Sequence, residues 1–203
     1  METVALATED ELSEAVGLRL LWEASLEAGL LFRRGGNGYL RSRLDSFCEI
    51  ARRQPLLIIT DLDRSVCPAA LRSAWFGRLS PPKGLLLRVA VREIESWLFA
   101  DHDAMQSLLG NAVAARFPDR PEGVENPKEL LLALAARAPR AVRADLCAVS
   151  GAFARQGLGY NARLCMFVRE MWNPDKAEAR SESLRRARKR ILELRMRLGN
   201  KAE

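Results

Sequence analysis

The sequence is organised around one stretch, Leu56-Leu57-Ile58-Ile59-Thr60-Asp61-Leu62-Asp63. This short run of Leu and Ile follows Pro55 and stops at two aspartates, a pattern typical of a strand that is buried on both faces. Ligands of open parallel sheets gather beyond the carboxyl ends of the strands. We therefore expect Asp61 and Asp63 to lie at a functional edge of the sheet, whatever other residues meet them there.

Three other apolar segments of the first half predict strands, at residues 3–8, 30–33 and 85–91. Apolar residues at helical spacing predict helices between them, from the acidic residues at 9–14 to about residue 27, over 40–51 and over 68–76. Four strands that alternate with three helices are typical of a parallel α/β sheet, because each crossover places a helix on the sheet.

The second half of the chain has the apolar spacing of helices. We expect one long helix over residues 92–109, closed by Gly110, and further helices over 128–137, 160–172 and 181–199. The chain is therefore expected to consist of an α/β core over residues 1–110 and a helical extension over 111–203 that packs on this core.

Composition limits the class of protein. With 203 residues, of which 48% are hydrophobic and 29% charged, the chain can bury one good core and is neither fibrous nor disordered. The four cysteines are scattered and form no CxxC pair, which argues against a zinc knuckle or a disulfide framework. An acidic amino terminus and the lack of an apolar run of about 20 residues argue against an export signal or a membrane anchor. We expect a cytoplasmic protein with no membrane partner; its oligomeric state stays open.

The net charge of +6 is concentrated at the carboxyl end. Residues 176–203 contain 10 Lys and Arg against 4 Glu, which leaves 22 charges of each sign in residues 1–175. A basic helix of this kind attracts phosphates through a salt-dependent interaction that does not read sequence. An ordinary solvated helix face is the alternative.

Acidic residues follow three of the four predicted strands. The three sets are Glu9, Asp10 and Glu14; Asp61 and Asp63; and Glu93 and Glu95. Two carboxylates about 4 Å apart repel by roughly 4 kcal/mol at a protein surface, so a group of them requires a cation. Oxygen ligands favour Mg²⁺ or Mn²⁺, and a single histidine argues against zinc. Taken one at a time, the same acids are ordinary turn and helix-start residues.

The chain resembles the Toprim fold of topoisomerases, primases and OLD-type nucleases, and more closely the small Toprim-like proteins grouped as the DUF4276 domain. The resemblance covers roughly residues 3–130. Its motifs are Thr8-Glu9-Asp10-Glu11-Leu12-Ser13-Glu14, Thr60-Asp61-Leu62-Asp63-Arg64, Val91-Arg92-Glu93-Ile94-Glu95-Ser96-Trp97-Leu98-Phe99-Ala100-Asp101 and Asn126-Pro127-Lys128.

The resemblance implies a set of metal ligands. The acidic first motif falls on Asp10 and Glu14, with Glu9 as a neighbouring substitute, since Glu11 stands where the family has glycine. The aspartate pair falls on Asp61 and Asp63. The helix motif falls on Glu95, with Glu93 and Asp101 as lesser candidates.

The resemblance also implies a function: metal-dependent cleavage of DNA or RNA, with an ATPase as partner in a bacterial defence or mobile-element system. The nucleic acid is expected to contact basic residues beside the acidic motifs and on the last helix, namely Arg64, Arg88, Arg92, Lys128, Arg185, Arg188 and Lys189. Two alternatives stay open. One is a non-catalytic Toprim-like binding subunit, and the other is a phosphatase of the haloacid dehalogenase type with a nucleophilic Asp61.

Overall fold

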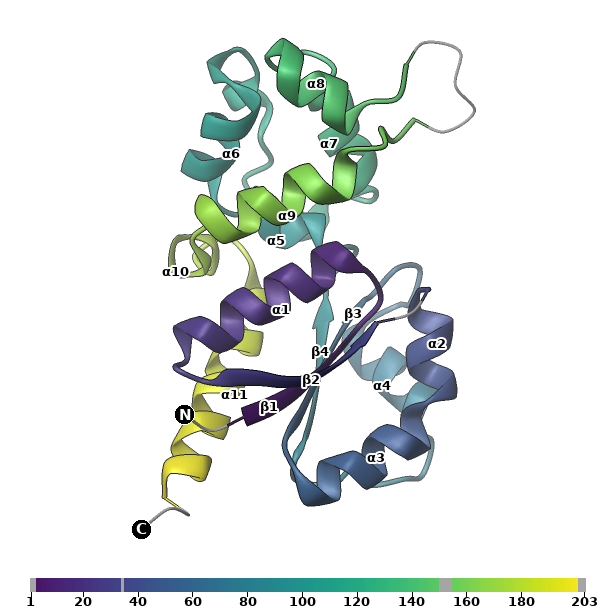
Figure 1. Ribbon diagram of the computed structural model, residues 1–203. Coiled ribbons are helices and arrows are strands. Elements are labelled where there is room, and N and C mark those ends of the chain that lie inside the picture. Colours follow the sequence, from purple (N-terminus) through teal and green to yellow (C-terminus); the bar gives the residue numbers. More distant parts are fainter. Residues whose placement is uncertain (1–2, 34, 150–154, 201–203) are drawn as a thin grey trace. The chain divides into compact units, whose positions relative to one another are not determined.

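A computed structural model describes residues 3–33, 35–149 and 155–200. Its first half is built on a sheet of four parallel strands in the order β2-β1-β3-β4 (Figure 1). The strands are β1 (Thr3–Thr8), β2 (Glu27–Arg33), β3 (Leu56–Asp61) and β4 (Leu85–Ala90). The predicted parallel α/β sheet of about four strands, followed by a helical second half, is confirmed.

Strand β3 lies inside the sheet, as its apolar sequence predicts. It pairs with β1, and it pairs with β4 in an unbroken register from Leu56 opposite Leu85 to Asp61 opposite Ala90. The first five residues of β3 are buried and its last residue, Asp61, is half-buried. The carboxylate motif therefore begins where the apolar part of the central strand ends.

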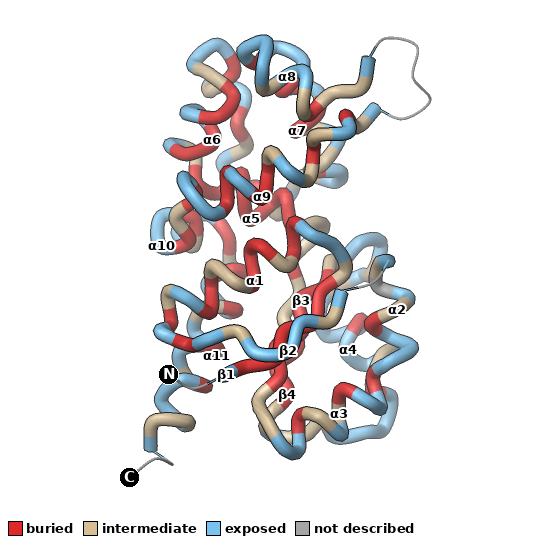
Figure 2. Tube along the Cα trace, viewed as in Figure 1, coloured by how far each residue is buried: buried red, intermediate tan, exposed pale blue. Residues whose placement is uncertain are grey.

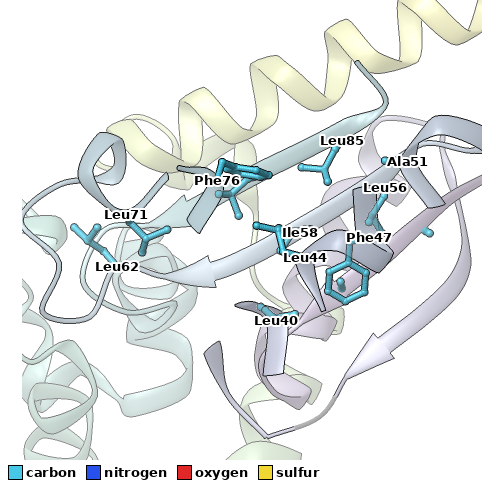
Figure 3. Packing of buried hydrophobic residues seen from close by; sticks show 13 residues of the cluster. Leu40, Leu44, Phe47, Ala51, Leu56, Ile58, Leu62, Leu71, Phe76 and Leu85 are labelled. Carbon is cyan, nitrogen blue, oxygen red and sulfur yellow. The ribbon is translucent and has the colours of Figure 1, made fainter. Parts of the chain in front are cut away.

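Helices cover both faces of the sheet (Figure 1). Helix α1 (Glu11–Glu23) lies on one face, where Gly17 lets it approach Leu6 of β1. Helices α2 (Asn37–Ser42), α3 (Leu44–Arg53) and α4 (Pro68–Phe76) lie on the other. Figure 3 shows the core between these three helices and the sheet, in which Phe47 of α3 and Phe76 of α4 pack with Ile58 of β3.

Helix α1 ends four residues before the predicted end at residue 27, because a turn built on Ser25 closes it. Ser25 has a positive φ of 56°. Its N–H donates to the carbonyl of Trp22, and the N–H of Leu26 donates to the carbonyl of Leu21. This pair of bonds is the Schellman motif, which usually has glycine at the position of Ser25. The predicted helix over 40–51 is likewise two helices, α2 and α3, with Arg43 between them.

The second half is helical, and the single long helix predicted over 92–109 is wrong. The structure has α5 (Glu95–Phe99) and α6 (His102–Leu109) instead. Asp101 separates them: its buried carboxylate accepts hydrogen bonds from the N–H of Ala104, as the N-cap of α6, and from the N–H of Asn173. A short polar side chain that bonds to the backbone competes with helix continuation.

The remaining elements follow in order after Gly110. They are η1 (Asn111–Arg116), η2 (Pro121–Gly123), α7 (Pro127–Ala135), α8 (Arg140–Leu146), α9 (Tyr160–Glu170), α10 (Pro174–Ala177) and α11 (Glu182–Gly199). The sequence predicted α7, α9 and α11 within a few residues of these bounds. The short elements η1, η2, α8 and α10 were not predicted.

The chain forms two compact units whose bounds differ from the predicted domains at 1–110 and 111–203. The first unit runs to Val91 and also includes the chain from Arg185 onward, and the second runs from Arg92 to Leu184. Most of α11 thus belongs to the unit of the sheet, and its Ala187, Ile191 and Leu194 are buried. Figure 2 shows the buried run of β3 in red. No helix among the described residues is long and apolar enough to span a membrane.

Candidate functional site

The carboxylate of Glu9 lies where the neighbouring strands β1 and β3 end. Glu9 is the first residue after β1. Its Oε1 atom accepts a hydrogen bond from the backbone N–H of Asp61, at 2.9 Å, and another from the hydroxyl of Thr60. Glu9 therefore joins the end of β1 to the strand that carries the aspartate motif.

The environment of Glu9 favours its uncharged form. Burial raises the pKa of the Glu9 carboxyl group above its ordinary value of 4.5. The hydrogen bonds from Thr60 and from the N–H of Asp61 lower this pKa, whereas the negative charges of Asp63 and Asp10 raise it further. The charges of Asp63 and Asp10 thus act on the carboxyl group that joins β1 to β3.

Asp63 projects from a sharp turn. The N–H of Leu62 donates to the carbonyl of Ala90, so that pairing with β4 continues one residue past β3. Asp63, which is exposed, then adopts a positive φ of 48°, and the N–H of Ser65 donates back to the carbonyl of Leu62. Arg92, two residues after β4, also has a positive φ, of 68°. Such conformations cost L-residues energy and are concentrated at functional sites.

The other three acids of the first motif, Asp10, Glu11 and Glu14, have structural partners. The carboxylate of Asp10 accepts a hydrogen bond from the N–H of Ser13, at 2.8 Å, and so caps α1. Glu14 lies 3.3 Å from Nε of Arg33, the last residue of β2, and Glu11 lies 2.7 Å from Nη1 of the same arginine. Of the four acids of this motif, Glu9 bonds to β3, through Thr60 and Asp61.

Glu95 is in the second unit, where it is buried beside Tyr160. It is 4% exposed, and its Oε1 accepts a hydrogen bond from the Tyr160 hydroxyl at 2.7 Å. Burial raises the pKa of Glu95 to about 7. The charge of Glu93 also raises this pKa, whereas the hydrogen bond from Tyr160 and the charge of Lys128 lower it.

Lys128 contacts the same tyrosine and is hydrogen-bonded to Glu93. The N–H of Lys128 donates to Oε2 of Glu93 at 2.8 Å. The Lys128 ammonium group lies 5.0 Å from the centre of the Tyr160 ring, in a cation–π contact. Lys128, predicted to contact nucleic acid, therefore has partners within its own unit. Asp101, a lesser candidate ligand, uses its carboxylate to cap α6.

The basic residues predicted to contact nucleic acid differ in exposure. Those that are exposed are Arg64, Arg185 and Lys189. Arg188 is half-buried and lies 3.5 Å from the carboxylate of Glu23. Arg88 is half-buried in β4.

The sequence did not predict two features of these sites, namely the choice of Glu9 over Asp10 and the contact between Glu95 and Tyr160. The sequence left Glu9 and Asp10 as alternatives, because both are acidic and Glu11 stands where the resembled family has glycine. The partnership of Tyr160 with Glu95 was not predicted at all. The two residues are 65 positions apart, and the apolar periodicity that identified both helices reports burial without naming the partner.

The donor atoms at this edge of the sheet are of the kind that binds a divalent metal. Glu9 and Asp63 supply carboxylate oxygens, which are the ligands that Mg²⁺ and Mn²⁺ prefer. Within the described ranges, no group of three or more acidic, histidine or cysteine side chains is placed to hold a metal ion. Mg²⁺ is commonly held by one or two carboxylates together with waters and substrate phosphates, and two nearby carboxylates meet that requirement.

Comparisons with protein-family models, curated proteins and solved structures gave no match to this chain.

Proposed function

We propose that this protein is a metal-dependent nuclease, which hydrolyses phosphodiester bonds of DNA or RNA at the carboxyl ends of β1 and β3. The observation that supports the proposal is the partly buried carboxylate of Glu9, held between two strand ends and close to Asp63. In this proposal Glu9 and Asp63 hold Mg²⁺ or Mn²⁺, and Asp61 lies beside them.

The cost of bringing two carboxylates together is the physical reason for assigning a cation to this edge. Burial and the nearby charges both disfavour the ionised form of Glu9. A divalent cation reverses that preference, because its charge stabilises both carboxylates. The N–H of Asp61 and the hydroxyl of Thr60 hold one oxygen of Glu9 in place, which orients the carboxylate before any ligand arrives.

The protein contributes position and charge to the reaction. When bound, a divalent ion would lower the pKa of a water and neutralise charge on the phosphate that is attacked. Asp61, half-buried at the end of β3, would add a further carboxylate beside the ion. Glu95 is not needed in this scheme, since its carboxyl group is buried against Tyr160.

Substitution of the two proposed ligands tests the metal site. Glu9→Gln and Asp63→Asn should each weaken Mn²⁺ binding at least tenfold, measured by calorimetric titration, and abolish Mg²⁺-dependent cleavage of a labelled oligonucleotide. Glu14→Gln is the matched control, because it removes the same charge from an acid that pairs with Arg33. Melting temperatures should be recorded for all three variants.

The same titration separates the proposal from its alternatives. Undiminished Mn²⁺ binding and cleavage by a Glu9→Gln, Asp63→Asn double variant would remove the proposed site. Loss of metal binding in Glu14→Gln, with Glu9→Gln unaffected, would favour the ligands that the family resemblance implies.

A non-catalytic binding subunit is the second candidate function. It is favoured by the finding that no group of three metal-binding side chains occurs in the part of the chain that the structure describes. A subunit of this kind would bind nucleic acid or an ATPase partner and would show no Mn²⁺ binding. Hydrolysis of a small phosphate ester, lost in Asp61→Asn, would instead indicate a phosphatase.

A further inference from the structure

Arg88 is an unusual residue for the position that it occupies. It lies in the edge strand β4, after three buried leucines, and is itself half-buried. Its Nε atom is buried, and no hydrogen-bond acceptor for it is present among the described residues. A buried N–H of a guanidinium group is costly to leave unsatisfied, so a ligand that supplies an acceptor there would be favoured.

Helix α11 brings a second arginine to this edge of the sheet. Nη1 of Arg197 lies 3.5 Å from the carbonyl oxygen of Lys83, just before β4 begins. Figure 3 shows the long helix α11, in yellow, passing the strand that carries Leu85. Arg190 precedes Arg197 by two turns, or about 10 Å along the helix, which brings it toward the part of β4 that carries Arg88.

Helix α4 supplies the third arginine. The guanidinium carbon of Arg72 lies 5.4 Å from the centre of the Phe76 ring. Phe76 packs with Leu85 and Leu87 of β4, so α4 lies on the face of the sheet opposite to the Arg88 side chain, and the charge of Arg72 acts on Arg88 across the edge of this strand. Arg72 and Arg190 are both accessible to a ligand: Arg72 is exposed, and the side chain of Arg190 is 52% exposed.

The charges of the other two arginines act on the guanidinium group of Arg88. Burial, and then the positive charges of Arg190 and Arg72, lower the pKa of Arg88 to about 10. Glu193, whose carboxylate lies 2.6 Å from Nη1 of Arg190, opposes this shift. Three positive charges against one negative charge leave this cluster with an excess that an anion would neutralise.

We propose that Arg72, Arg88 and Arg190 together bind a backbone phosphate of a nucleic acid. Guanidinium groups present planar pairs of donors that match phosphate oxygens, and they keep their charge when partly buried. The site would hold the nucleic acid through its backbone and therefore without reading its sequence. The inference rests on the proposed nucleic-acid substrate, but it concerns binding and not cleavage.

Binding of a labelled oligonucleotide in EDTA, followed by fluorescence anisotropy over a range of salt concentrations, tests this site separately from the metal. Arg88→Gln and Arg190→Gln should each weaken binding and reduce the slope of log K against log salt by about 1. Arg195→Gln is the matched control, since it removes one charge from an exposed position of the same helix. Because Arg190 lies at the surface, Arg190→Gln tests the site even if Arg88→Gln fails to fold.

The outcomes distinguish a phosphate site from a general charge effect. Equal loss of binding in Arg88→Gln, Arg190→Gln and Arg195→Gln would overturn the proposal, as would unchanged binding in the first two. The second probe is inorganic phosphate at constant ionic strength. The contrary outcome is that inorganic phosphate raises the melting temperature of the wild type but not of Arg88→Gln, while both proteins bind the oligonucleotide equally. In that case the site binds free phosphate, and its assignment to nucleic acid is wrong. Asp63→Asn should lose cleavage but still bind the oligonucleotide. This result would show that the phosphate site acts independently of the proposed catalytic site.

Discussion

The buried carboxyl group of Glu95 links the stability of the protein to pH. Its pKa in the folded protein, about 7, lies above its ordinary value of 4.5. Between these values the folded state holds more protons than the unfolded state, so the free energy of unfolding falls as the pH rises from about 4.5 to about 7. Below this window the contribution is fully present, and above it the contribution is lost.

Glu95→Gln should remove this dependence, because an amide stays neutral and its oxygen can still accept the Tyr160 bond. At pH 8 the variant should be more stable than the wild type by about 2 to 3 kcal/mol, and at pH 4.5 the two should be nearly equal. Urea denaturation at pH 4.5, 6 and 8 measures the difference. Glu125→Gln, at an exposed position of the same unit, is the control. Parallel curves for Glu95→Gln and wild type across this range would contradict the prediction.

At the scale of single elements, the end of α1 shows how one residue sets a boundary. Ser25 takes the left-handed position that closes the helix, where glycine has no steric cost. The sequence has Gly29 four residues later, so the usual signal for a helix end is displaced. That displacement is why periodicity extended the predicted helix into the beginning of β2.

Ser25→Gly should therefore stabilise the protein, by about 1 kcal/mol, since it relieves the left-handed strain and keeps both backbone hydrogen bonds of the turn. Ser46→Gly is the matched control, because Ser46 lies inside α3, where the same change should destabilise by about 0.5 kcal/mol. Thermal and urea unfolding of both variants would measure these changes. A loss of stability in Ser25→Gly would mean that the serine side chain contributes more than the backbone conformation costs.

At the scale of the whole molecule, the chain leaves the unit of the sheet after Val91 and returns to it at Arg185. The returning helix α11 buries Ile191, which is 1% exposed, and Leu194, which is 3% exposed. Burial of each such side chain contributes roughly 1.5 to 3 kcal/mol, a large part of the 5 to 15 kcal/mol that stabilises a typical domain. The unit of the sheet therefore depends on a segment almost a hundred residues away in sequence.

Ile191→Ala should cost about 2 to 5 kcal/mol of unfolding free energy. Amide hydrogen exchange should then accelerate in β1 and β3 more than in α5 and α9, because α11 belongs to the unit of the sheet. Leu192→Ala, at a side chain that is 49% exposed, should change both quantities little. Acceleration confined to α5 and α9 would show that α11 stabilises the other unit instead.

The sequence determined by itself whatever depends on local pattern. The apolar run 56–59 specified a strand buried on both faces, and the alternation of segments specified a parallel sheet. Chain order alone put Asp61 and Asp63 at the carboxyl edge of this sheet. Burial pattern and turn chemistry act between neighbours in sequence, so they can be read without knowing the fold.

Only the tertiary structure decided which side chains meet. It brought Glu9 rather than Asp10 to β3, paired Glu95 with Tyr160, used Asp101 to divide a helix and returned α11 to the sheet. Each of these outcomes depends on contacts between segments far apart in the chain. For Glu9 and Asp10, it also depends on which of two adjacent side chains points toward β3 at the end of β1. Apolar periodicity predicts that a side chain is buried, but the partner it is buried against is set by the packing of the whole chain.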